Sequence, residues 1–213
     1  MLLVDARRLA RSTGARGMIL RLEVNMTVQS PIRQSGIALV FTLLLTSVAF
    51  GTETYTARAE LRTADGKLHA APVTVSLDRI LTPAERETLI TAFRAGDAAA
   101  LRKAIAAQSS LGYVEGGSKT RVPIKFAFPR STGDGKILTI VCSEPIVHIG
   151  GDMPDAKPKA GFDVAFLLLV LDAGGNGTGE IAPAAKLKVR EDGALVTEDY
   201  GAQTIWLKDV ARK

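Results

Sequence analysis

Short segments of alternating apolar and polar residues make up most of the chain after residue 52, and this pattern is typical of β-strands with one buried face. Strands are predicted at residues 54–63, 68–77, 121–128, 136–142, 162–171, 180–190, 194–198 and 202–207. In the third segment Val122, Ile124, Phe126 and Phe128 alternate with small or basic residues. Because short turns join these segments, we expect a largely antiparallel sheet.

The first two strands are predicted to form a hairpin. Asp65 and Gly66 lie between them, and an Asp-Gly pair is typical of a two-residue hairpin turn. Pro72 lies inside the second strand, and proline lacks the N–H needed for a full ladder. The second strand is therefore expected at an edge or next to a bulge.

A helix is predicted to begin at Pro83. Thr82 and Glu85 have the spacing of a capping box, and proline is favoured at the first helical position. An apolar stripe follows, formed by Leu89, Ile90 and Phe93.

A second helix is predicted directly after the first. Gly96 ends the first helix and Asp97 caps the second, which runs to about Gln108 and buries Leu101 and Ile105. The predicted fold class is thus α+β: a mostly antiparallel sheet, closed as a barrel or stacked as a sandwich, with a helical hairpin inserted at about residues 83–108.

Two apolar runs differ in what they predict. Gly36–Phe50 contains 15 apolar or small residues after Arg33, with small residues at 47–49 where a signal peptidase would cut. As a helix it would span roughly 22 Å, which is less than the ~30 Å of a bilayer core, so a cleaved export signal is favoured over an anchor. Phe162–Leu171 is shorter still and is predicted to be a central buried strand.

This division predicts a leader over residues 1–51 and a single β-rich α+β domain over residues 52–213. The arginine-rich first 25 residues fit either a start codon assigned too early, with Met18 or Met26 as the true first residue, or an organelle presequence; the first interpretation is favoured. The domain is expected outside the cytoplasm, in the periplasm or the extracellular space. Membrane contact is expected only through the leader, if it is not cleaved.

Charge and cysteine content narrow the function classes. The chain carries a net charge of +5, but residues 1–51 hold six arginines and two acids, and residues 52–213 hold 21 basic and 20 acidic residues. A nearly neutral domain lacks the basic surface that a nucleic acid requires, so no nucleic-acid partner is expected. Cys142 is the only cysteine, which excludes an intrachain disulfide.

Motifs for catalysis, cofactors and metals are incomplete. The segment from Asp172 to Glu180 resembles a calcium loop, but it lacks the carboxylate at its twelfth position and the flanking helices, so a glycine-rich hairpin turn is predicted instead. Cys142, Glu144 and His148 would suit a cysteine nucleophile, yet the sequence around Cys142 is typical of a buried strand end. We therefore predict no catalytic residue, no cofactor and no metal site.

Four segments resemble a group of uncharacterised exported bacterial proteins: LTPAERETLITAFRAGD at 81–97, LGYV at 111–114, GNGTGEIAPAAKLK at 175–188 and EDYGAQTIWLKDV at 198–210. Relatives in that group have Asn-Tyr and Pro-Val-Arg-Leu where this chain has Asp199-Tyr200 and residues 204–207. The resemblance implies export and a shared fold, and it implies no activity.

The expected function is that of an exported, non-enzymatic domain that binds a partner protein, an envelope component or an apolar small molecule. Tyr113, Asp152, Trp206 and the loop Gly150–Gly161 are the candidate contacts, with packing of Trp206 in the core as the alternative. The alternative function is a hydrolase whose carboxylates meet only in the fold, such as Glu144, Asp152 and Glu198.

Overall fold

The structure is a computed structural model that describes residues 51–95 and 98–213. The predicted export signal at 36–50 lies outside the described residues, as does the predicted helix junction at Gly96 and Asp97. In chain order the elements are β1 (Glu53–Arg62), β2 (Leu68–Leu77), α1 (Pro83–Ala95), α2 (Ala98–Ala107), β3 (Gly112–Gly116), β4 (Arg121–Ser131), β5 (Gly135–Cys142), β6 (Val164–Asp172), β7 (Gly177–Val189), β8 (Leu195–Tyr200) and β9 (Ile205–Arg212).

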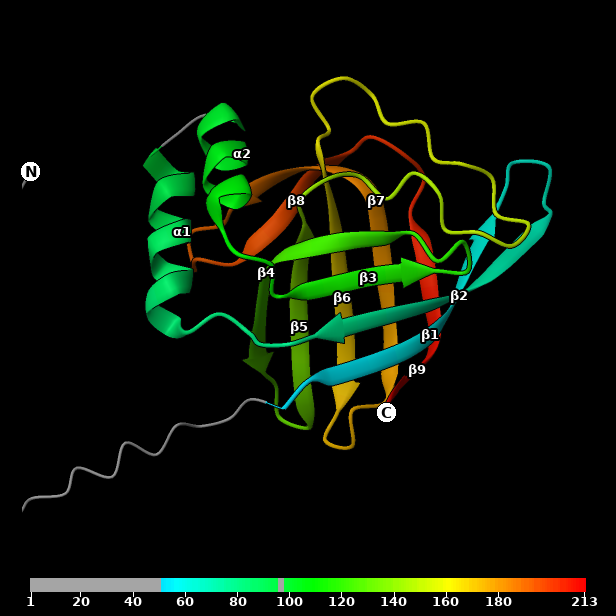
Figure 1. The fold of residues 1–213 in the computed structure, drawn as a ribbon, viewed down its shortest axis with the longest axis horizontal. Coiled ribbons are helices and arrows are strands. Elements are labelled where there is room, and N and C mark those ends of the chain that lie inside the picture. Colours follow the sequence, from blue (N-terminus) through cyan, green and yellow to red (C-terminus); the bar gives the residue numbers. More distant parts are fainter. Residues whose placement is uncertain (1–50, 96–97) are drawn as a thin grey trace, which may run out of the picture. The chain divides into compact units, whose positions relative to one another are not determined.

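The strands form a closed antiparallel barrel of eight strands with one additional strand (Figure 1). Their order is β6-β5-β4-β3-β2-β1-β9-β7-β8, and a further pairing of β6 with β7 closes the ring. The long strand β7 pairs with β9 through its first half and with β8 through its second half, so β8 extends the barrel wall. The predicted antiparallel sheet is confirmed, and of the two predicted shapes the barrel is the one observed.

The barrel interior is filled by side chains from alternating positions of each strand. Strand β6, predicted as a central buried strand, pairs with β5 and β7, and its Ala165, Leu167 and Leu169 are completely buried. Ile140 of β5 and Leu207 of β9 are equally inaccessible. Eight strands enclose about the space that such side chains fill, which accounts for a packed core.

A polar cluster lies at one end of the barrel. The hydroxyl of Tyr55 donates to Oε2 of Glu53 at 2.7 Å, and Nζ of Lys136 lies 3.3 Å from the same oxygen. Arg212 lies 3.2 Å from the other oxygen of Glu53. Burial alone would raise the pKa of Glu53, but the Tyr55 hydroxyl and the two cations outweigh it and lower that pKa.

Residues 143–163 form a long connection across the opposite end of the barrel (Figure 1). Ile146, Ile149 and Met153 are buried in the core, and the N–H of Ile146 donates to the carbonyl of Pro183 at 2.9 Å. The predicted surface loop at 150–161 is part of this connection, which has no helix or strand. Among the described residues, none of the helices has the length and apolar character to span a membrane.

A bulge at Lys125 changes which face of β4 is buried in the barrel. Ile124 pairs with Cys142, but Phe126 pairs with Val141, so one residue of β4 is extra. Val122 and Ile124 therefore point into the barrel, whereas Phe126 and Phe128 point outwards, although all four alternate in sequence. Nζ of Lys125 donates to the carbonyl of Gln108 at 2.6 Å, just beyond the end of α2.

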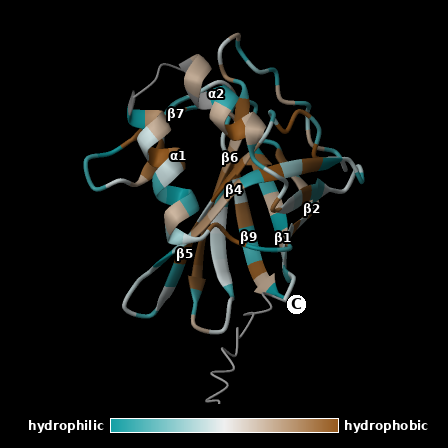
Figure 2. Ribbon diagram, turned by 60° about the vertical axis from the view of Figure 1, so that its left-hand side comes forward, coloured by the Kyte–Doolittle hydropathy of each residue, from teal (hydrophilic) through white to brown (hydrophobic). Residues whose placement is uncertain are grey.

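The two helices lie on the outside of the barrel (Figure 2), where α1 contacts β7 and α2 contacts β4. The predicted capping box is confirmed: the N–H of Thr82 donates to Glu85 Oε2 at 2.8 Å, and the N–H of Glu85 donates to Thr82 Oγ1 at 3.2 Å. Leu89, Ile90 and Ile105 are buried as predicted. The side chain of Leu101 is outside the described set, and the hairpin formed by the two helices stays a prediction.

Candidate functional site

The turn between β7 and β8 is a three-residue loop. The N–H of Arg190 donates to the carbonyl of Ala194 at 2.9 Å, and the N–H of Gly193 donates to the carbonyl of Arg190 at 3.0 Å. Gly193 has a φ of 76°, which favours glycine because it lacks a Cβ. Asp192 accepts the N–H of Ala194 through Oδ1 at 3.0 Å, and this fixes the carboxylate at the tip of the turn.

Helix α1 holds this turn in place. Arg86 donates from Nη2 to the carbonyl of Gly193, and Arg94 donates to the carbonyl of Glu191 at 3.4 Å. The guanidinium of Arg86 also lies 4.8 Å from the ring centroid of Phe128, within the range of a cation–π contact. The first turn of α1, the β7–β8 turn and the outer face of β4 are thereby fixed relative to each other.

A pocket of about 280 Å³ lies between these three parts. We call it the outer pocket because its floor is the outer face of the barrel: Phe126 and Phe128 of β4, Ile137 and Thr139 of β5, and Leu168 of β6. Leu195 and Val196 of β8 form an apolar wall. The charged residues are at its rim: Arg86, Arg130, Arg190 and Asp192.

The rim carries more positive than negative charge. Its lining contains three arginines and one carboxylate, that of Asp192, and Nη2 of Arg190 lies 3.8 Å from Oδ2 of Asp192. The backbone N–H of Ala194 is the largest influence that lowers the pKa of Asp192, and the charges of Arg190 and Arg130 lower it further against the effect of desolvation. Asp192 is therefore ionised at neutral pH, and it neutralises one of the cations.

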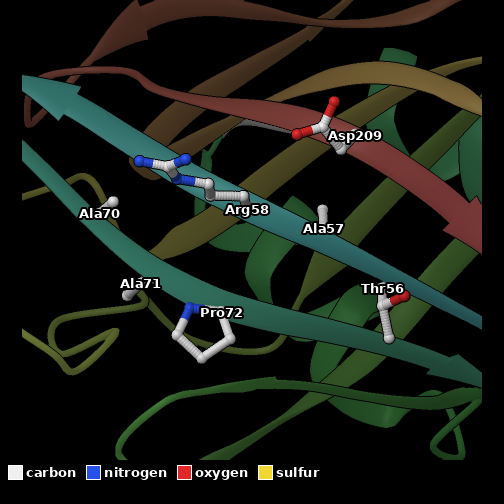
Figure 3. Close-up of a pocket in the computed structure, with 7 residues that line it drawn as sticks. All are labelled: Thr56, Ala57, Arg58, Ala70, Ala71, Pro72 and Asp209. Carbon is white, nitrogen blue, oxygen red and sulfur yellow. The ribbon is translucent and has the colours of Figure 1, made fainter.

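A second concavity lies on the other side of the barrel, over β2, β1 and β9 (Figure 3). This groove has a volume of about 460 Å³ and is lined largely by short side chains of β1 and β2, with Arg58 and Asp209 at its polar side. It lies at a bulge in the pairing of β1 with β9, where Asp209 has a φ of 51°. The bulge and the small side chains account for the groove. Arg58, at its polar side, is ion-paired with Glu60 at 3.3 Å.

The three predicted contact residues are outside the lining of the outer pocket. Tyr113 is half-buried on β3 beneath Arg121, whose guanidinium lies 4.2 Å from its ring centroid. Asp152 accepts the N–H of Ala70 at 3.2 Å and lies 3.3 Å from Nδ1 of His69, close enough for an ion pair but without hydrogen-bond geometry.

Trp206 is 55 % exposed on the outer face of β9. The alternative interpretation, that it packs in the core, is therefore wrong. Its cross-strand partners are Glu60 on β1 and Glu180 on β7, so the indole lies between two acidic positions.

Of the residues considered for a cysteine nucleophile, Glu144 is near enough to Cys142 for its charge to help raise the pKa of the thiol, but His148 interacts elsewhere. Cys142 is completely buried, and burial raises the pKa of its thiol, which opposes formation of a thiolate. His148 is exposed and interacts with Asp155 instead. Within the described part of the chain, no three His, Cys, Asp or Glu side chains are grouped closely enough to hold a metal ion.

The carboxylates considered for a hydrolase are on different parts of the fold. Glu144 and Asp152 are exposed in the 143–163 connection, whereas Glu198 is exposed on β8. Glu198 lines a pocket of only about 60 Å³ with Asp163, and the carboxylate of Asp163 is ion-paired with Arg102. This arrangement leaves little room for a substrate between two carboxylates.

Sequence reasoning did not identify the arginines of the outer pocket. One signal was present: Phe126, Phe128 and Arg130 alternate, so a guanidinium ends an apolar row. No family model, curated protein or solved structure matches this chain. The outer pocket is therefore interpreted from its own geometry.

Proposed function

We propose that this protein is an exported, non-enzymatic binding protein that holds a small apolar molecule in the outer pocket. The observation that carries the proposal is a concave apolar floor on the outside of the barrel, bounded by a helix and a turn that hydrogen bonds hold together. Ligand sites are typically concave, mostly apolar and largely pre-formed, with volumes of about 300–1,000 Å³. The volume of about 280 Å³ favours a small ligand over a partner protein or an envelope polymer.

The apolar floor alone supports modest affinity. A ligand that buries roughly 200 Å² of apolar surface, about as much as an aromatic side chain, gains about 5 kcal/mol. Without other terms, that free energy corresponds to a dissociation constant on the order of 10⁻⁴ M. Tighter binding requires contacts with the polar rim.

Binding is favoured over hydrolysis because the outer pocket has a single carboxylate. Asp192 is fixed by the N–H of Ala194 and lies beside two guanidinium groups, so it is a poor proton donor at neutral pH. General acid–base hydrolysis by paired carboxylates requires a second acidic group facing the first. We accordingly propose no catalytic residue, cofactor or metal.

The same proposal includes export, the helical hairpin at about 83–108 and kinship with exported bacterial proteins. The apolar run Gly36–Phe50 supports export, and the four sequence segments support the kinship. The hairpin is supported by the short connection between α1 and α2. Sequencing the N-terminus of the protein recovered outside the cytoplasm tests export. A mature N-terminus upstream of Gly36 would contradict a cleaved signal.

Titration with a neutral fluorescent probe, N-phenyl-1-naphthylamine, tests the outer pocket. Thr139 is on the floor between Phe128 and Leu168, so Thr139→Trp should fill the pocket and weaken probe binding at least 10-fold. Thr74→Trp is the matched control, because Thr74 also faces outwards but is on β2. Equal probe binding by both variants, or no binding by the unmodified protein, would contradict the proposal.

A further inference from the structure

We propose that the ligand of the outer pocket is an amphiphile whose anionic head, a carboxylate or a phosphate, is bound between Arg130 and Arg190. This inference rests on the proposed function and adds the chemical class of the ligand. The apolar part of the ligand would lie on the floor, and the head would lie at the rim.

The guanidinium of Arg86 already interacts with other groups of the protein. It donates to the carbonyl of Gly193, stacks on Phe128 and lies 3.5 Å from Oε2 of Glu87. Its side chain is only 21 % exposed, which fits a residue that positions the turn. Arg86 is therefore a positioning residue, and the head group must be bound by the other two arginines.

Among the described residues that line the outer pocket, Asp192 is the one carboxylate near Arg130 and Arg190. Arg190 makes a long 3.8 Å ion pair with Asp192, and Arg130 is near enough to lower the pKa of the same carboxylate. Two guanidinium groups and one carboxylate leave one positive charge without a counter-charge at the rim. An anion supplied by the ligand would neutralise it, and a neutral or cationic head would not.

The position of Arg130 links the head to the apolar floor. Arg130 is two residues after Phe128 on the same face of β4, and its cross-strand partner is Ile137 of the floor. Arg190 ends the β7 side of the facing turn, so the two guanidinium groups approach the rim from different elements. The planar guanidinium fork suits carboxylate and phosphate oxygens, which accept two parallel hydrogen bonds.

Competition against the bound neutral probe tests this inference. Decanoate and decyl phosphate should displace N-phenyl-1-naphthylamine at concentrations about 10-fold lower than decan-1-ol, and decylamine should be the weakest competitor. The variant Arg130→Gln/Arg190→Gln should still bind the probe but lose the preference for the anions. The control Arg58→Gln/Lys208→Gln removes the same charge from β1 and β9, outside the outer pocket, and should keep the preference.

The outcomes separate this inference from the proposed function. If the probe binds but decanoate and decan-1-ol displace it equally, the anionic head is refuted and the apolar pocket stands. The inference is also refuted if the Arg130→Gln/Arg190→Gln variant keeps its preference, or if the control variant loses it. If the unmodified protein does not bind the probe, both the proposed function and this inference are refuted.

Discussion

Three hairpin turns of the barrel have the same backbone arrangement and provide an internal comparison of glycine replacements. The loops after β1, β6 and β7 each place a glycine at their last position, with φ of 84° at Gly66, 83° at Gly175 and 76° at Gly193. A left-handed conformation costs a residue with a Cβ roughly 1–2 kcal/mol. Alanine also lowers the entropy of the unfolded chain, which offsets about 0.4–1 kcal/mol of that cost.

The surroundings of the new Cβ should separate the three variants. A Cβ at Gly66 would meet nothing within 4 Å, and one at Gly193 would lie 3.4 Å from Nη2 of both Arg86 and Arg94, which is an ordinary van der Waals distance. A Cβ at Gly175 would lie 2.8 Å from Cβ of Arg212, which is fixed to the backbone of β9. We expect losses of about 1 kcal/mol for Gly66→Ala and Gly193→Ala, and about 1–3 kcal/mol more for Gly175→Ala.

Urea unfolding followed by circular dichroism measures these differences. With a slope of about 2 kcal/mol per molar urea, the midpoint should fall by roughly 0.5 M for Gly66→Ala and Gly193→Ala, and by at least about 1 M for Gly175→Ala. Three equal midpoints would refute the assigned contact with Arg212. An unchanged midpoint for Gly66→Ala would refute the shared left-handed turn itself.

Three further predictions concern the helix cap, the polar cluster and the buried thiol. Thr82→Ala should lower the free energy of unfolding by about 1 kcal/mol, because it removes the cap of α1; the exposed Thr91→Ala is the control, and equal urea midpoints would contradict the cap. The lowered pKa of Glu53 stabilises the fold above the ordinary value of 4.5, and this contribution is lost as the pH falls through the lowered pKa. The free energy of unfolding, measured across that pH range, should therefore depend less on pH in Glu53→Gln than in Glu87→Gln. An equal dependence on pH in the two variants would contradict the polar cluster around Glu53. Iodoacetamide should label Cys142 at neutral pH only after unfolding in urea, because burial raises the pKa of its thiol; rapid labelling of the native protein would contradict its burial.

Local signals in the sequence predicted most elements of the fold. The Thr82–Glu85 capping box depends on residues three apart, and the structure contains both of its hydrogen bonds. The Asp65-Gly66 turn was predicted in the correct place, but its loop has three residues because only Gly66 takes a positive φ. The prediction that the second strand lies at an edge is wrong, because β2 lies between β1 and β3. Pro72 is accommodated because it pairs with Arg58 of β1 at a point beyond the end of β3.

The features of the fold that the sequence did not predict depend on pairing between strands that are distant in the sequence. Closure of the barrel depends on the pairing of β6 with β7 and of β1 with β9, which joins segments near opposite ends of the described chain. Trp206 continues an alternating pattern, yet its side chain faces outwards because Ile205 and Leu207 occupy the inner face of β9. Alternation identifies a strand, but it does not identify which of its two faces is buried.

The outer pocket depends on the bulge at Lys125, and this explains why its residues were not predicted. Without the extra residue, Phe126 and Phe128 would continue the inner row of Val122 and Ile124, and Arg130 would point into the apolar interior of the barrel. A charge there would be strongly destabilised, so the position of Arg130 is compatible with the fold only because the bulge turns it outwards. The bulge thus places two aromatic rings on the floor of the outer pocket and a guanidinium at the rim beside them. The apolar floor and the cation that we assign to the ligand head therefore have one structural origin.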